Sequence, residues 1–284
     1  MRNINEVQKR SIVKDYQQME TGNGRVKTGI YGLDKLINGG IPKGNIVLVS
    51  GAAGTGKTLF ALEYIYRGAK EFNENGVYLS LEETPERLVQ TAQNFGFSDI
   101  EDLLRAGRIN LLRSEVYDLE TLTNKIEDSI DRVNAKRVVI DSISVLSAFT
   151  DNQLLVRRTI MDISNMIREH GCTSIFTGSM KKINNGSELG VSTEEYVVDG
   201  VIALFHKLIG NSFYRSIGII KMRETAHSEV LHPLQIVNKG LRILPPDLLP
   251  KSDNRISEKI TRHYQHIRQN YSDDEGVILP LAEV

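Results

Sequence analysis

The fold is decided by the stretch Gly51-Ala52-Ala53-Gly54-Thr55-Gly56-Lys57-Thr58. It matches the pattern G-x-x-x-x-G-K-[ST] at every fixed position. The apolar run before it, residues 46–50, predicts a buried strand, and apolar residues at helical spacing follow it between positions 59 and 69. A strand, a glycine-rich loop and a helix in this order are typical of a phosphate-binding loop.

The residue types of this loop suit a nucleoside triphosphate. Glycines allow the backbone N–H groups to approach phosphates closely, and the helix that follows adds its positive N-terminal end. In this pattern the lysine, Lys57, contacts the β- and γ-phosphates, and the hydroxyl of Thr58 binds Mg²⁺. We therefore predict that residues 51–58 bind ATP together with Mg²⁺.

A carboxylate at the end of another strand would complete the magnesium site. Residues 137–141 (Arg-Val-Val-Ile-Asp) form an apolar strand that ends in Asp141. The carboxyl ends of parallel strands meet at one edge of a sheet, where the phosphate loop also lies. Asp141 is predicted to hold Mg²⁺ directly or through its water molecules. The alternative is that Asp141 only caps the strand end or the following turn.

A pair of glutamates follows a third apolar run. The run spans residues 77–81 and leads into Glu82 and Glu83. Either carboxylate could accept the proton of an attacking water molecule, and the sequence does not separate the two. Alternatively, Glu83 and Thr84 could cap a helix that begins at Pro85.

Apolar runs alternate with helical patterns from Lys27 onward, which is the signature of an α/β fold with a mostly parallel twisted sheet flanked by helices. The later runs are short and separated by tight turns, which predicts a C-terminal antiparallel extension: residues 200–205, 217–221, 234–237 and 241–244. We expect an N-terminal extension over residues 1–24, an ATPase domain over residues 25–246, and a helical or flexible tail over residues 247–284.

Composition excludes several classes of protein. Of the 284 residues, 35 are basic and 36 acidic, so no overall positive field recruits nucleic acid or an anionic membrane. The single cysteine, Cys172, cannot form an internal disulfide and fits a reducing compartment. No run of 18 apolar residues occurs, and the N-terminus does not resemble a signal peptide. These features predict a cytoplasmic protein without membrane insertion.

The sequence resembles the RecA superfamily and, more closely, the KaiC family of ring ATPases. The resemblance covers residues 26–244 and rests on four ordered motifs, which are residues 28–44, the phosphate loop, the double glutamate, and residues 220–228 (Ile-Lys-Met-Arg-Glu-Thr-Ala-His-Ser). It implies a RecA-like P-loop NTPase core and a hexamer with ATP bound and hydrolysed at each subunit interface. It further implies that unidentified regulatory proteins read the nucleotide state.

The last of these motifs carries two cations. In the family, the lysine and arginine of this motif reach the γ-phosphate of the neighbouring subunit's ATP, which implies these roles for Lys221 and Arg223. The two residues are two apart on a predicted strand and so share one face, where a common anion would relieve their repulsion. The alternative is a pair of solvated charges at the sheet edge.

The sequence departs from the clock members of the family in two ways. Those proteins have two tandem ATPase domains, whereas this chain has one. Where their second domain phosphorylates its own Ser-Thr pair, this sequence has Glu195-Tyr196, while Ser192 and Thr193 are out of register. This difference argues against an autokinase, although an autokinase or protein kinase remains an alternative.

Two further alternatives remain open. One is a RecA- or Rad-like ATPase that binds single-stranded DNA through the loop at residues 180–187, which contains Lys181 and Lys182. No aromatic residue accompanies these lysines, so nucleic-acid binding is possible but not favoured. The other is a regulator that binds nucleotide without hydrolysing it, against which the glutamate pair argues.

Overall fold

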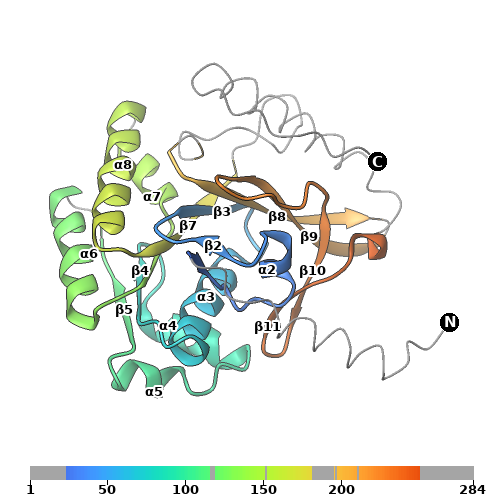
Figure 1. The fold of residues 1–284 in the computed structure, drawn as a ribbon, viewed down its shortest axis with the longest axis horizontal. Helices are drawn as coiled ribbons and strands as arrows, with labels where there is room; N and C mark the ends of the chain where they lie inside the picture. Colours follow the sequence, from blue (N-terminus) through green and yellow to red (C-terminus); the bar gives the residue numbers. More distant parts are fainter. Residues whose placement is uncertain are drawn as a thin grey trace.

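The computed structural model of the chain describes residues 24–115, 119–150, 152–180, 195, 197–209 and 211–249. A nine-stranded sheet forms its centre, in the order β11-β10-β9-β8-β3-β7-β6-β4-β5 (Figure 1). The strands are β3 (Ile46–Gly51), β4 (Gly76–Ser80), β5 (Ile109–Arg113), β6 (Arg137–Asp141), β7 (Thr173–Ser179), β8 (Gly200–Ile209), β9 (Ser212–Met222), β10 (His232–Val237) and β11 (Gly240–Ile243).

The sheet has a parallel part and an antiparallel part. From β8 through β3, β7, β6 and β4 to β5, all neighbouring strands are parallel. Strands β9, β10 and β11 continue the sheet beyond β8 with antiparallel pairing. The α/β fold with a C-terminal antiparallel extension is thereby confirmed. In this arrangement the carboxyl ends of β3, β7, β6 and β4 lie along one edge of the sheet.

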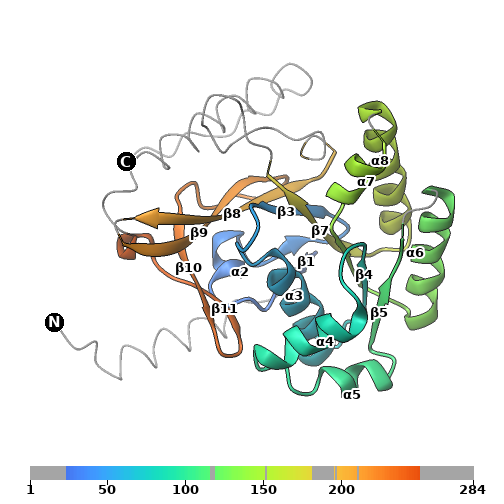
Figure 2. The ribbon, with the colours of Figure 1, turned by 180° about the vertical axis from the view of Figure 1, so that it is seen from behind.

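Helices cover both faces of the sheet, as Figures 1 and 2 show. One face carries α3 (Lys57–Glu71), α4 (Pro85–Asn94) and α5 (Ile100–Arg105), and the other carries α6 (Leu119–Val133), α7 (Ser144–Phe149) and α8 (Gln153–Glu169). Successive strand residues point to opposite faces. In β3, therefore, Val47 and Val49 pack with the first group while Ile46 and Leu48 pack with the second.

Smaller elements precede β3 and follow β11 in the described part of the chain. They are β1 (Arg25–Val26), α2 (Leu33–Leu36), β2 (Ile41–Pro42) and the 3-10 helix η2 (Pro246–Leu248). Strands β1 and β2 pair antiparallel in a separate small sheet. Within the described ranges, no helix has the length and apolar character needed to cross a membrane.

A buried arginine joins several of these elements. Arg137, at the start of β6, is fully buried and forms an ion pair of 2.6 Å with Glu74. Its guanidinium also donates to the carbonyl oxygens of Tyr64 (2.9 Å) and Lys27 (2.7 Å). Five N–H donors in fixed geometry suit such a junction, because a buried charge must be paired and hydrogen-bonded. Arg137 thus fastens α3 and the N-terminal segment to β6.

Candidate nucleotide-binding site

The phosphate loop connects β3 to α3, as its sequence predicts. Gly56 is the N-cap of α3 and has a φ of 105°, a conformation that favours glycine. Gly51 allows a close approach, because a Cβ there would lie 2.7 Å from the carbonyl oxygen of Leu204 and from Thr55 Oγ1. Both glycines therefore have steric reasons to occupy their positions, and the loop they shape leads into the N-terminus of a 15-residue helix.

Lys57 lies against this loop. Its Nζ donates hydrogen bonds to the carbonyl oxygens of Gly51 (2.9 Å) and Ala52 (3.0 Å). Burial lowers the pKa of Lys57, while the negative charges of Asp141 and Glu82 oppose that change. The ammonium group is therefore positioned at the loop, within the field of Asp141, the predicted magnesium ligand, and of Glu82, one of the two predicted catalytic glutamates.

Thr58 and Asp141 come together although they are 83 positions apart in the sequence. Thr58 Oγ1 donates a hydrogen bond of 3.0 Å to Asp141 Oδ2. Asp141 is the last residue of β6 and only 6% exposed. A hydroxyl and a carboxylate are the hard oxygen ligands that Mg²⁺ prefers, so the two residues fit such an ion.

Two hydroxyl groups that the sequence analysis missed hold the same carboxylate. Tyr78 on β4 donates to Asp141 Oδ2 at 2.6 Å, and Thr177 on β7 donates to Asp141 Oδ1. Burial, and then the charge of Asp141, raises the pKa of Tyr78 well above its ordinary value, so the phenol stays protonated as a donor. A residue with a hydroxyl group inside an otherwise apolar run that predicts a buried strand is the sequence signal that could have indicated Tyr78 and Thr177.

The glutamate pair begins two residues after the end of β4 and lies at the same edge of the sheet. The backbone N–H groups of Glu82 and Glu83 both donate to Ser80 Oγ, at 3.3 and 2.8 Å. Glu82 is exposed and Glu83 half-buried. Of the two, Glu82 is the residue whose charge acts on the pKa of Lys57. Thr84 occupies the N-cap position of α4, as the capping alternative for Glu83 and Thr84 expects, but its side chain makes no capping hydrogen bond there.

The β8–β9 hairpin also contacts the phosphate loop. Arg215 on β9 donates to the carbonyl oxygen of Gly54 through Nε (3.3 Å) and Nη2 (3.2 Å). Arg215 lowers the pKa of His206 on β8, after the larger effect of burial. Arg215 gives no signal in the sequence pattern, because only strand pairing brings it to a loop 161 positions away.

Lys221 and Arg223 lie at the opposite end of the sheet. Lys221 Nζ donates to the carbonyl oxygen of Val198 at 2.8 Å, and Arg223 Nη1 lies 3.4 Å from Asp199 Oδ1. The backbone N–H of Asp199 in turn donates to the carbonyl oxygen of Ile46, the first residue of β3. Five residue steps of an extended strand separate that point from Gly51, about 16 Å. The two cations are therefore not brought to the phosphate loop of their own chain.

The structure corrects one detail of this motif. Lys221 and Arg223 were expected to lie on one face of a single strand, but β9 ends at Met222 and Arg223 belongs to the turn that follows. Both side chains nevertheless reach adjacent residues, Val198 and Asp199. They converge because the antiparallel register that pairs Met222 with Gly200 continues to Arg223, whose backbone N–H donates to the carbonyl oxygen of Asp199 at 2.9 Å.

Other expectations fall outside the described residues. These are residues 181–187 of the predicted DNA-binding loop, with Lys181 and Lys182, the out-of-register Ser192 and Thr193, and Tyr196. The N-terminal residues 1–23 and the tail at residues 250–284 also lie outside them.

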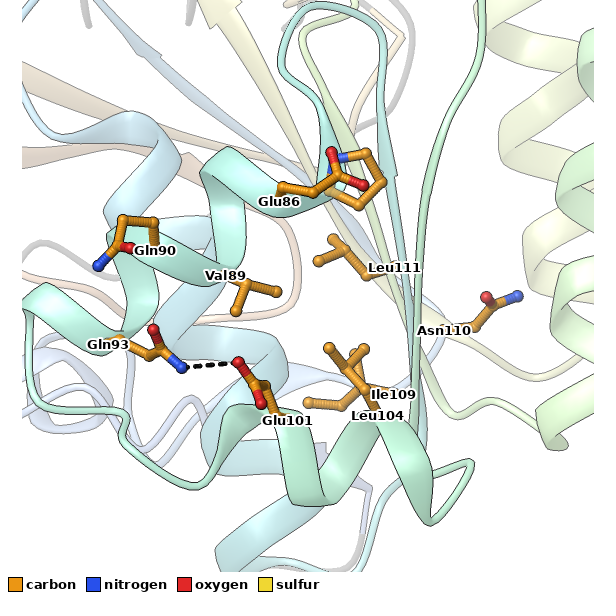
Figure 3. A pocket seen from close by; sticks show the side chains of 10 residues that line it. Glu86, Val89, Gln90, Gln93, Glu101, Leu104, Ile109, Asn110 and Leu111 are labelled. Carbon is orange, nitrogen blue, oxygen red and sulfur yellow. Dashed lines mark hydrogen bonds between the residues drawn. The ribbon is translucent and has the colours of Figure 1, made fainter.

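A groove separate from the phosphate loop lies between α4, α5 and β5, with a volume of about 550 Å³ (Figure 3). Its apolar side chains are Val89, Leu104, Ile109 and Leu111. At its rim, Gln93 Nε2 donates to Glu101 Oε1 at 2.9 Å. The groove includes Pro85 and Glu86 from the first turn of α4 but neither glutamate of the pair.

Comparisons with known proteins give one consistent result. A family model described as "ATPase: KaiC" matches residues 26–248. UPF0273 protein MJ1359 of Methanocaldococcus jannaschii is 34% identical over 242 residues, which cover 79% of this chain and 98% of that protein. The circadian clock oscillator protein KaiC of a Picosynechococcus strain is 35% identical over 79% of this chain, but only 45% of its own length is matched.

A solved structure shows the same likeness. The crystal structure of KaiC-like protein PH0186 from Pyrococcus horikoshii superimposes with a TM-score of 0.71 at 35% identity. The match covers 78% of this chain and 99% of the other.

Proposed function

Because this chain belongs to the KaiC family of ATPases, we propose that it binds Mg·ATP at residues 51–58 and hydrolyses it to ADP and phosphate. The observation that carries the proposal is the meeting of Thr58 with Asp141, at 3.0 Å, beside Lys57. A phosphate loop alone binds nucleotide. A carboxylate held next to its threonine adds the second anchor that a magnesium ion needs during phosphoryl transfer.

Each side chain at the nucleotide site has a distinct role. Lys57 contacts the β- and γ-phosphates and neutralises their charge, as its position against the loop supports. Thr58 and Asp141 hold Mg²⁺, which supplies positive charge that stabilises the phosphate oxygens. Tyr78 and Thr177 keep the carboxylate of Asp141 in one orientation, because they donate to its two different oxygens.

The glutamate pair activates water. The water oxygen forms a bond to the γ-phosphorus, the bond between that phosphorus and the bridging oxygen of ADP breaks, and the proton of the water passes to a glutamate carboxylate. Glu82 is the better candidate for this base, because its charge acts on Lys57, which contacts the same phosphates. The backbone N–H of Glu83 then supports the turn that positions Glu82, through its hydrogen bond to Ser80 Oγ.

The site is completed by a second subunit. Lys221 and Arg223 lie beside Val198 and Asp199, and Asp199 is bonded to Ile46, which is about 16 Å along β3 from Gly51. The two cations therefore serve the nucleotide of a neighbour. A ring, with six subunits as the KaiC resemblance implies, places each ATP between one subunit's loop and the next subunit's cations. Arg223 then stabilises charge on the γ-phosphate as an arginine finger does. Regulatory proteins would read the nucleotide state of such a ring.

Phosphate release by the purified chain in Mg·ATP tests the hydrolytic function. We expect multiple turnovers from the wild type and little release from Asp141→Asn, which removes the anionic anchor. If the wild type binds ATP but releases no phosphate over several hours, the hydrolytic function is wrong and the chain is a regulator that binds nucleotide without hydrolysing it. The mass of the particle in solution, measured with and without Mg·ATP, tests the assembly. A monomer in both conditions with undiminished turnover would contradict the shared site.

A further inference from the structure

Asp199 forms a junction that the proposed catalytic roles do not explain. It lies immediately before β8, and its side chain is only 10% exposed. Asp199 Oδ2 accepts hydrogen bonds from the backbone N–H of Ile46 (2.9 Å) and from Arg168 Nη2 on α8 (2.7 Å). Its other oxygen, Oδ1, faces Arg223 Nη1 at 3.4 Å. One buried carboxylate therefore links the first residue of β3, the helix α8 and the predicted arginine finger.

The backbone of the same segment repeats these links. The N–H of Asp199 donates to the carbonyl oxygen of Ile46, and the N–H of Arg223 donates to the carbonyl oxygen of Asp199, both at 2.9 Å. The neighbouring carbonyl oxygen, that of Val198, accepts from Lys221 Nζ. Both cations of the late motif are thus attached to a dipeptide that is itself fixed to β3.

We propose that Asp199 is a positioning residue: it holds the Arg223 guanidinium for the neighbouring subunit's nucleotide and ties its position to β3, which leads into the phosphate loop. The inference rests on the proposed function, in which Arg223 acts across the subunit interface. Its basis is the difference between the two carboxylate oxygens. Oδ2 is fixed by two short hydrogen bonds, whereas Oδ1 makes a long contact with a guanidinium that is half exposed.

This difference between the two oxygens of Asp199 suits an arginine that the carboxylate must orient and that must still be able to leave the carboxylate for a phosphate. A long, partly solvated ion pair is weak, so a phosphate with more charge can draw Arg223 forward. Because Asp199 remains bonded to Ile46, the direction of Arg223 is set relative to β3. That strand is fully buried from Ile46 to Gly51, and it carries any displacement toward the loop that binds the next nucleotide. Adjacent sites in the ring are thereby coupled.

A double-mutant cycle between Asp199→Asn and Arg223→Ala tests the proposal. If Asp199 acts through Arg223, Asp199→Asn lowers kcat by about 10- to 100-fold and leaves KM within about threefold, because misplacement affects the transition state more than binding. The double variant should then be no slower than Arg223→Ala alone. Losses that multiply would show that Asp199 acts independently of Arg223 and would overturn the proposal.

Arg168→Gln is the matched control. It removes the shortest ion pair of Asp199 without touching Arg223, so we expect a lower melting temperature and a kcat within about threefold of the wild type. If Asp199 only stabilised the fold, Arg168→Gln would lower kcat as much as Asp199→Asn does. Should Asp199→Asn not assemble, Asp199→Glu keeps the charge while displacing it, and the same cycle applies.

The outcome for Arg223 separates this proposal from the function on which it rests. A normal kcat in Arg223→Ala would refute the trans-acting finger itself, and with it any positioning role for Asp199. An inactive Arg223→Ala combined with a wild-type kcat in Asp199→Asn would refute only the positioning role. In the latter case Arg223 would find the neighbouring nucleotide without guidance from the carboxylate.

Discussion

Thr58 and Asp141 meet through a hydrogen bond of 3.0 Å between Oγ1 and Oδ2. Thr58 belongs to the first turn of α3 and Asp141 ends β6, and β7 lies between β6 and the strand that carries the phosphate loop. Thr177, on that intervening strand, donates to the other oxygen of Asp141. The site therefore depends on the order of the strands as much as on the loop itself.

Lys57→Ala is expected to weaken ATP binding by well over tenfold, because the phosphates lose their main point charge. Isothermal titration with ATP and Mg²⁺ measures the change. Lys70→Ala is the matched control, since Lys70 lies on the same helix but pairs with Asp99. An affinity of the Lys57 variant within about threefold of the wild type, about 0.6 kcal/mol, would show that the loop was misassigned.

The Glu82→Gln/Glu83→Gln double variant should bind ATP normally and hydrolyse it about 10²- to 10⁴-fold more slowly, because amides cannot accept the proton. Of the single variants, Glu82→Gln should lose more activity than Glu83→Gln. Glu86→Gln, an exposed glutamate in the first turn of α4, serves as the control. Wild-type phosphate release by the double variant would place the base elsewhere.

The activity should fall as the pH rises through about 8. Burial, reinforced by the charge of Arg223, lowers the pKa of Lys221 to about 8. Above that pH Lys221 loses its proton, and with it the positive charge that the γ-phosphate needs. The pH profile of kcat/KM measures this, since it reports groups of the free enzyme.

Lys221→Arg should move that fall to higher pH, because a guanidinium stays protonated. Lys239→Arg, at an exposed lysine between β10 and β11, should keep the wild-type profile. An unchanged descending limb in the Lys221 variant would assign the titration to another group.

Stability should decrease with rising pH through the titration of Glu63. Burial raises the pKa of this α3 residue to about 7, although Arg67 at 2.7 Å opposes the shift. The folded state therefore binds the proton more tightly than the unfolded state. The stabilisation is complete below about pH 4.5 and is lost as the pH rises through 7, with a size on the order of 3 kcal/mol.

Glu63→Gln tests this, because an amide does not titrate. Denaturant unfolding between about pH 5 and 8 should show a shallower loss of stability for this variant than for the wild type. Glu71→Gln removes the other carboxylate bonded to Arg67 and should keep the wild-type slope. Equal slopes for the wild type and Glu63→Gln would contradict the assignment.

The parallel core of the fold and the loop were predictable because their signals are local. Residues 51–58 carry a fixed pattern, and the buried strands appear as continuous apolar runs. Strand β5 was missed because Ile109–Arg113 is a short edge strand whose residues are mostly half-buried, so its pattern is weak. Helices α5 and α7 have six residues each, too few for a clear helical period.

The contacts within the site were less predictable. Tyr78 and Arg215 reach their partners only through strand pairing and tertiary packing, which a periodic pattern does not encode. The remoteness of Lys221 from its own loop does follow from an expected feature. A strand antiparallel to β8 must end where β8 begins, which is the edge of the sheet opposite the loop.

Mixing two inactive variants tests the shared site most directly. Arg223→Ala keeps its glutamate pair, and Glu82→Gln/Glu83→Gln keeps Arg223. If Arg223 acts across the interface, mixed rings contain interfaces where an intact Arg223 meets an intact pair on the neighbour. Phosphate release should therefore reappear on mixing and reach a maximum at intermediate ratios of the two variants. Activity that stays at the level of the separate variants at every ratio, with mixed assembly verified by native mass spectrometry, would contradict the trans-acting account.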